Sequence, residues 1–168
     1  AKVGSSSAWA AAWAAVPSTS DAGMRVRTGA DSLAGLPALR AAVANGRIGR
    51  LAKHFYGVPT NRSQRHTLEV DCPEVLRRCR EDNVQAAVLV PNCPVCHQTL
   101  SLVARYLEAA GISTVLLACA KDIVEHCGVP RAMFSDFPLG NAAGKPKDSA
   151  SQAATLELAL RTLETAPC

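Results

Sequence analysis

The sequence predicts an α/β fold with three layers: a short parallel sheet with helices on both faces, in a Rossmann-like arrangement. Segments 84–90 and 113–118 are apolar along most of their length and have the length of single buried strands. Each is followed by a segment whose apolar residues have helical spacing. Short apolar strands that alternate with helices are typical of a parallel sheet covered on both sides.

Bulk composition indicates one globular domain and excludes two classes of partner. The chain has 168 residues, of which 48% are hydrophobic and 19% charged, so it can bury a sizeable core. Its net charge is only +4 and its basic residues are spread along the sequence, which argues against nucleic-acid binding. Apolar runs stay shorter than the roughly 18 residues that a membrane helix needs. We therefore expect neither a nucleic-acid nor a membrane partner.

Cysteine usage points to a reducing compartment. The seven cysteines fall mostly within helix or strand patterns, and their number is odd: Cys72, Cys79, Cys93, Cys96, Cys119, Cys127 and Cys168. A chain of this size does not need disulfides to hold its core. We predict a cytoplasmic protein with structural thiols and one functional pair.

The chain is predicted to divide into residues 1–34, a tail or docking segment, and residues 35–168, the α/β domain. The alanine-rich stretch 8–15 fits a docking helix or a linker, and it resembles a signal peptide only weakly because it lacks a basic start. No strand is expected in it.

Helices within the domain are predicted from apolar spacing and from flanking glycines, over 36–45, 71–83, 94–110, 121–127 and 151–165. Asp71 and Glu74 have the spacing of a capping box at the start of the second helix. Segment 47–59 is expected to be a loop or short strand, 131–135 a third strand, and 136–149 a loop.

The candidate nucleophile follows the first apolar strand. A strand ending at Pro91 and a helix starting near Pro94 place Cys93 on the turn and Cys96 in the first helical turn. Free backbone N–H groups and the positive end of the helix dipole favour a thiolate there. The outer cysteine of such a pair can have a pKa well below its free value of about 8.5. Cys93 is thus predicted to attack and Cys96 to resolve the product as a disulfide. His97 is placed to assist proton transfer or to orient the helix.

The same motif admits other interpretations. Cys93, Cys96 and His97 match the C-x-x-C-H attachment site of a c-type haem, although that cofactor requires export. A structural zinc site would need a second ligand pair, and no second C-x-x-C exists in the sequence. The two cysteines can also be helix-start residues without chemistry. We predict no metal site.

Ligands of parallel α/β sheets bind beyond the carboxyl ends of the strands. The residues predicted to contact a substrate there are Asn92, Cys119, Arg131, Gly140, Asn141 and Gly144. Loops as long as 136–149 are usually functional, and its glycines permit close approach of a ligand or a partner chain. The alternatives are an ordinary crossover loop and, for Cys119, a structural thiol.

Several motifs share their order and spacing with one known family. They are Gly46 to Leu51, His54 to Gly57, Ala87 to Thr99, Glu108 to Ile112, Val129 to Ala132, and Pro138 to Pro146. With them, residues 35–165 resemble the glycine/sarcosine/betaine reductase selenoprotein B family, and among its members those of proline reductases.

The resemblance implies a reductase in which Cys93 stands where the family has selenocysteine, with Cys96 and His97 matching the residues that follow. It implies attack on a small amine or amino-acid derivative and reductive cleavage of a C–N bond. The activating pyruvoyl group would belong to a partner subunit, so no cofactor is expected in this chain. It further implies a homo- or hetero-oligomer and an external thiol or disulfide reductant. The family's first strand has no clear equivalent in residues 1–34.

A second enzymatic interpretation keeps Cys93 without a redox cycle. A cysteine at the end of a strand in a parallel sheet also suits isomerase or lyase chemistry of the racemase-like type. A Cys96→Ser variant separates the two, because only a redox cycle needs the second thiol.

Overall fold

One mixed sheet organises the chain. The computed structural model describes residues 10–15, 25–27, 35–60 and 62–166. Its strands are β1 (Ala10–Ala15), β2 (Arg25–Arg27), β3 (Arg50–Leu51), β4 (Phe55–Gly57), β5 (Ala86–Val90), β6 (Ser113–Ala118) and β7 (Ala132–Phe134). Its helices are α1 (Leu36–Ala44), α2 (Gln64–His66), the π-helical turn η1 (Thr67–Asp71), α3 (Cys72–Glu81), α4 (Pro94–Ala109), α5 (Lys121–His126) and α6 (Ser149–Thr165).

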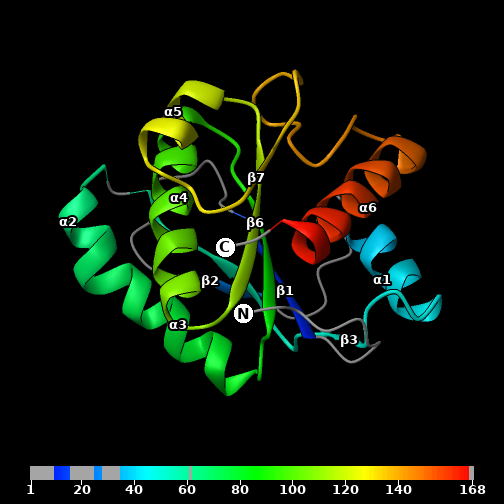
Figure 1. Cartoon of the computed structure of the whole chain (residues 1–168), viewed down its shortest axis with the longest axis horizontal. Coiled ribbons are helices and arrows are strands. Elements are labelled where there is room, and N and C mark those ends of the chain that lie inside the picture. Colours follow the sequence, from blue (N-terminus) through cyan, green and yellow to red (C-terminus); the bar gives the residue numbers. More distant parts are fainter. Residues whose placement is uncertain (1–9, 16–24, 28–34, 61, 167–168) are drawn as a thin grey trace.

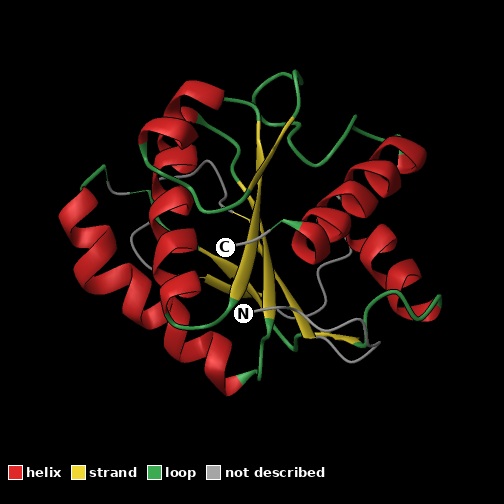
Figure 2. Ribbon diagram, in the orientation of Figure 1, coloured by secondary structure: helices red, strands yellow, loops and turns green. Residues whose placement is uncertain are grey.

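The strands lie in the order β2-β4-β1-β5-β6-β7, and β3 also pairs with β1. All pairings are parallel except that of β2 with β4. Figures 1 and 2 show α2 to α5 on one side of the sheet and α1 with α6 on the other. The predicted three-layer α/β fold is confirmed.

Two buried clusters explain why the central strands are apolar throughout. On β5, Ala87 and Leu89 face the cluster under α3 and α4, whereas Val88 and Val90 face the cluster under α1 and α6. Strand β6 alternates in the same way. Because side chains of a strand alternate between faces, a sheet covered on both faces needs apolar residues at every position.

The prediction that residues 1–34 form a tail or docking segment without a strand needs correction, because two parts of this segment are strands of the sheet. Residues 10–15 form β1, which lies between β4 and β5 in the middle of the sheet, and 25–27 form β2 at one edge. Alanine has the highest helix propensity, but propensity is a weak prior, and pairing with β5 in register overrides it. The rest of this segment lies outside the described residues.

The predicted start of the second helix is wrong. The helix begins at Gln64, where the Ser63 side chain accepts a hydrogen bond from the His66 N–H. Asp71 already has helical backbone angles and makes no capping bond. Glu74 instead binds Arg77 and Arg78, one helical turn further on. The expected capping box is thus an ordinary set of helix-surface ion pairs.

A buried polar cluster ties β4 to the end of α3. The Tyr56 hydroxyl donates to Asp82 Oδ2 at 2.5 Å, and both the backbone and the ring of His54 contact the same carboxylate. Burial and the Asp82 carboxylate raise the pKa of Tyr56 far above its usual value, so the hydroxyl stays protonated and donating.

We expect Tyr56→Phe to lower the free energy of unfolding by about 1–3 kcal/mol, because the buried Asp82 carboxylate loses a donor. Urea unfolding measures this. Tyr106→Phe, at a partly buried tyrosine of α4, is the matched control and should change stability by less than about 0.5 kcal/mol. Equal effects of the two variants would contradict the structural role given to this cluster.

Candidate active site at the end of strand β5

The strand order places the turn after β5 at a special point of the sheet. Strands β4-β1-β5-β6-β7 follow the doubly wound order 2-1-3-4-5. The helix after β1 lies on one face of the sheet, and the helix leading into β5 lies on the other. In such sheets the ligand crevice lies beyond the carboxyl ends of the two central strands, here β1 and β5. Cys93, three residues beyond β5, lies at this end of the sheet.

The local geometry of Cys93 is that of a helix N-cap. Its backbone is extended, with φ −138° and ψ 168°, and its sulfur accepts a hydrogen bond from the Cys96 N–H at 3.2 Å. Pro94 occupies the first helical position, where no N–H is needed. The backbone thus directs an N–H at the Cys93 sulfur, as the sequence predicts.

The structure joins Cys93 and Cys96 by a disulfide, with Cα atoms 5.0 Å apart. Cys96 is completely buried against α3 and β5, whereas Cys93 is partly exposed. Cys93 is therefore the more accessible of the two cysteines, and Cys96 is its buried disulfide partner.

His97 is fully buried and both of its ring nitrogens are bonded. Nε2 accepts the Cys119 backbone N–H at 3.0 Å, and Nδ1 lies 2.8 Å from the Cys93 carbonyl oxygen. Because Nε2 accepts, the proton of the neutral ring is on Nδ1, which donates to Cys93. Burial lowers the pKa of His97 below its ordinary value, while the Cys93 carbonyl and the Asp122 carboxylate oppose that shift.

A pH effect on stability follows. The unfolded chain takes up a proton on His97 below about pH 6.5, whereas the folded chain does so only at lower pH. Stability is therefore complete above that pH and falls as the pH drops toward the folded-state pKa. We expect a loss of up to about 2 kcal/mol between pH 7 and pH 5 that His97→Gln removes. His126→Gln, at an exposed position, should keep the loss; urea unfolding at both pH values compares them.

Cys119 has its backbone at the site and its sulfur elsewhere. Its N–H binds His97, but its side chain packs with the cluster on the α1 and α6 side, whereas Cys93 packs on the α3 and α4 side. The Cys119 sulfur lies 4.0 Å from the Ser135 hydroxyl. Burial raises its pKa, and contacts with Ser135 and the Phe137 backbone oppose this. It is not a second sulfur beside Cys93.

Arg131 does not reach the site. Its guanidinium is buried and bonds Glu108 at 2.7 Å and the Thr114 carbonyl oxygen at 2.8 Å. Glu108 lies in the last turn of α4 and Thr114 is the second residue of β6, at the amino end of the sheet, while Cys93 lies at the carboxyl end. The expectation that Arg131 contacts a substrate is corrected: it holds α4 to β6.

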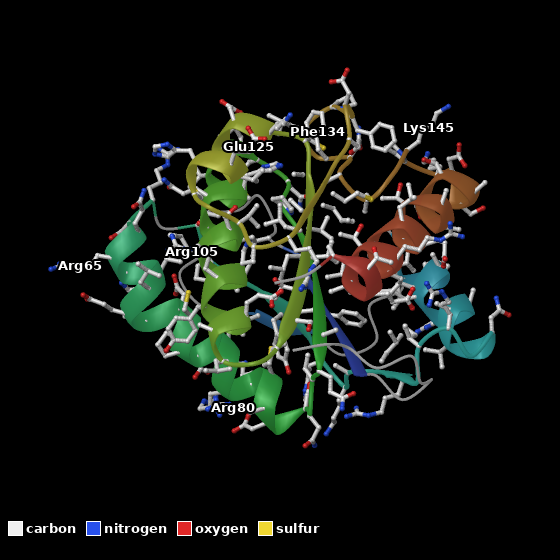
Figure 3. The ribbon with its side chains drawn as sticks, in the orientation of Figure 1. Arg65, Arg80, Arg105, Glu125, Phe134 and Lys145 are labelled. Atoms are coloured by element: carbon white, nitrogen blue, oxygen red, sulfur yellow. A yellow bond between two sulfur atoms is a disulfide. The ribbon has the colours of Figure 1, made fainter. Side chains whose placement is uncertain are left out.

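In the loop 136–149, Gly144 is needed for packing against α6, and not for the approach of a ligand. A Cβ on Gly144 would lie 3.0 Å from the backbone of Gln152, so glycine is needed where the loop meets α6. Gly140 has open space around it, and the Asn141 N–H bonds the Pro138 carbonyl. Figure 3 shows Lys145 of this loop at the same end of the molecule as Phe134, the last residue of β7. The loop thus borders the carboxyl end of the sheet.

The remaining described thiols are poor nucleophiles. Burial raises the pKa of Cys72 and of Cys79 to about 12 in each case, and it also raises that of Cys127. Cys168 lies outside the described residues. Of the cysteines with a described environment, Cys93 alone combines partial exposure with a helix N-cap position.

The haem interpretation does not fit this geometry, because both nitrogens of His97 are engaged and neither is directed at an open site. Among residues 10–15, 25–27, 35–60 and 62–166, no three His, Cys, Asp or Glu side chains are grouped to bind a metal. Over the same ranges, no helix is long and apolar enough to cross a membrane.

Two features of the site were missed from the sequence. Strand β1 lies beside β5 in the sheet, and a short apolar run followed by Pro17 and Ser18 is its only signal in the sequence. Ser135 lies beside Cys119 because it directly follows β7 at the carboxyl end. Strand alternation along 113–119 could have shown that Cys119 faces away from Cys93.

Comparison with known proteins gives one clear relative. No protein-family model matches the sequence, and no solved structure matches it. The chain is 33% identical over 95 residues to "D-proline reductase subunit gamma" of Acetoanaerobium sticklandii, covering 56% of this chain and 39% of that subunit. The chain thus spans about two-fifths of the length of this curated relative. The predicted resemblance is confirmed: the protein is homologous to the gamma subunit of a D-proline reductase.

Proposed function

We propose that this chain is the thiol-bearing part of a reductase, with Cys93 as the attacking sulfur and Cys96 as the resolving sulfur. The observation that carries the proposal is the pairing of a partly exposed Cys93 at a helix N-terminus with a buried Cys96, beyond the carboxyl end of β5 in the doubly wound sheet. Homology to a reductase subunit supports the reaction class.

The proposed reaction is a two-electron reductive cleavage of a C–N bond in a small amine or amino-acid derivative. The Cys93 thiolate bonds the carbon as the nitrogen leaves with the C–N electron pair and takes a proton. The Cys96 thiolate then attacks the Cys93 sulfur, and the carbon keeps the S–C electron pair and takes a second proton. Two thiolates become one disulfide, which an external dithiol reduces.

The proposal assigns the rest of the machinery to partners. The pyruvoyl group implied by the family resemblance would lie on a partner subunit and would supply an electron sink for the substrate. The carboxyl end of the sheet exposes Phe134, Phe137 and Leu139. Exposed apolar side chains of this size are those that protein interfaces cover. Their position supports a hetero-oligomer that brings the substrate to Cys93.

Redox titration with peptide mapping tests this proposal. The chain is equilibrated with dithiothreitol at defined potentials, alkylated, and mapped by mass spectrometry. We expect one reversible two-electron transition in which Cys93 and Cys96 change together, and Cys119→Ser should leave it unchanged. A transition that involves other cysteines, or a Cys93–Cys96 bond that does not re-form, would refute the redox role.

A further inference from the structure

Taken together with the proposed function, on which this inference rests, the contacts of His97 assign it one of the two roles that the sequence leaves open. We infer that His97 is a positioning residue: as a neutral ring it links the turn after β5 to the turn after β6, and it supplies no proton to the reaction.

The first argument is the occupancy of the ring. Nδ1–H donates to the Cys93 carbonyl at 2.8 Å, and Nε2 accepts from the Cys119 N–H at 3.0 Å. A proton on Nε2 would face the N–H of Cys119 and break that bond. The ring can therefore not become an imidazolium, the form that donates a proton, without losing one of its two anchors.

The second argument is burial. His97 has no exposed surface, so a substrate above the partly exposed Cys93 does not meet its ring. A buried imidazolium is costly unless an opposite charge lies against it. The ionisable group that acts on the ring is Asp122 of α5. The Cys119 thiol packs on the α1 and α6 side of the sheet, and Cys93 and Cys96 carry thiols only when their disulfide is reduced. Asp122 is exposed, and its attraction for a charged ring is smaller than the effect of burial. The net shift of the His97 pKa is therefore downward, which favours the neutral ring.

The third argument is what the two bonds join. Cys93 caps α4, and Cys119 is the first residue after the neighbouring strand β6, so the His97 side chain fixes the two turns relative to each other. The Ser101 hydroxyl donates to the His97 carbonyl, which ties the same residue into α4. The ring thus holds the Cys93 backbone where the Cys96 N–H meets the Cys93 sulfur. The protons of the reaction must then come from solvent or from a partner subunit.

The direct test is the protonation of His97 in the full-length chain, read from ¹⁵N chemical shifts and two-bond couplings of the imidazole. We expect the proton on Nδ1, an unprotonated Nε2, and a neutral ring at pH 6, where a free histidine is largely protonated. A ring protonated on Nε2, or an imidazolium at that pH, overturns the inference. This readout needs no variant and does not depend on the reactivity of Cys93.

A second test uses Cys93 alkylation by iodoacetamide across pH after reduction. In His97→Gln the amide oxygen can still accept the Cys119 N–H, so we expect the pH profile of Cys93 to stay within about 0.3 units of the parent. His97→Phe keeps the size but no acceptor, and the Cys93 rate should fall about three- to tenfold as the turn loosens. If Gln and Phe both raise the midpoint by about one unit, a histidine charge acts on Cys93 and the inference fails. A parent Cys93 that is unreactive at every pH instead refutes the proposed function alone, because the ¹⁵N test still decides the role of His97.

Discussion

Arg131→Met should lower the free energy of unfolding by about 3–5 kcal/mol, the largest stability effect expected of any single change described here. Removing this cation leaves the Glu108 carboxylate buried without its charged partner. That carboxylate also accepts from the Thr114 backbone and hydroxyl, so the join between α4 and β6 loosens as well.

Urea unfolding of three variants separates this buried pair from surface ion pairs. Arg77→Met breaks the exposed pairs of Arg77 with Glu74 and Glu81, and it should change stability little, because solvent screens exposed ion pairs. The double variant Glu108→Gln with Arg131→Met removes both charges but keeps an oxygen acceptor for Thr114, and it should recover part of the loss. If Arg131→Met costs no more than Arg77→Met, Arg131 is not the structural clamp described here.

Cys96→Ser should trap a mixed disulfide on Cys93, the largest chemical effect expected. When the reduced chain reacts with a disulfide reagent such as dithiobis(nitrobenzoate), Cys93 attacks the reagent and one thionitrobenzoate is released. In the parent, Cys96 then displaces the second thiol and closes the internal disulfide. We expect the mixed disulfide to last at least about a hundredfold longer without Cys96, as judged by intact mass and by released thiol.

Cys119→Ser is the matched control and should release both thiols as the parent does, because its sulfur lies on the other side of the sheet. Equal persistence of the mixed disulfide in the parent and in Cys96→Ser would contradict the resolving role. Cys96→Ser also distinguishes the redox cycle from the isomerase or lyase alternative, because catalysis in that alternative survives the loss of Cys96.

Periodicity and turn residues were enough to predict much of the fold. The apolar segments become β5 and β6, and Gly111 ends α4 with a positive φ, as expected. Strand β1 could not be predicted in this way, because alanine carries little strand preference and its pairing with β5 depends on residues more than seventy positions away. The capping-box motif at Asp71 failed because Ser63 starts the helix earlier.

The site was predictable where its chemistry is local. Cys93 and Cys96 share one helix turn, so their relation depends on sequence spacing alone. The orientations of the Arg131 and Cys119 side chains depend on contacts with residues that are distant in the sequence. The Arg131 side chain binds Glu108, and the Cys119 side chain packs on the face of the sheet opposite to Cys93. His97 needed both of its bonding partners, which lie at the ends of neighbouring strands, before its role could be inferred.

The most direct test of the central claim is peptide-resolved alkylation of the reduced chain across pH, read by mass spectrometry. The account predicts that Cys93 reacts quickly below about pH 7, as a thiolate held at a helix N-terminus does. Cys72 and Cys79, whose thiols burial keeps protonated, should react only after unfolding. If Cys93 instead reacts no faster than Cys119 at any pH, Cys93 is not the nucleophile.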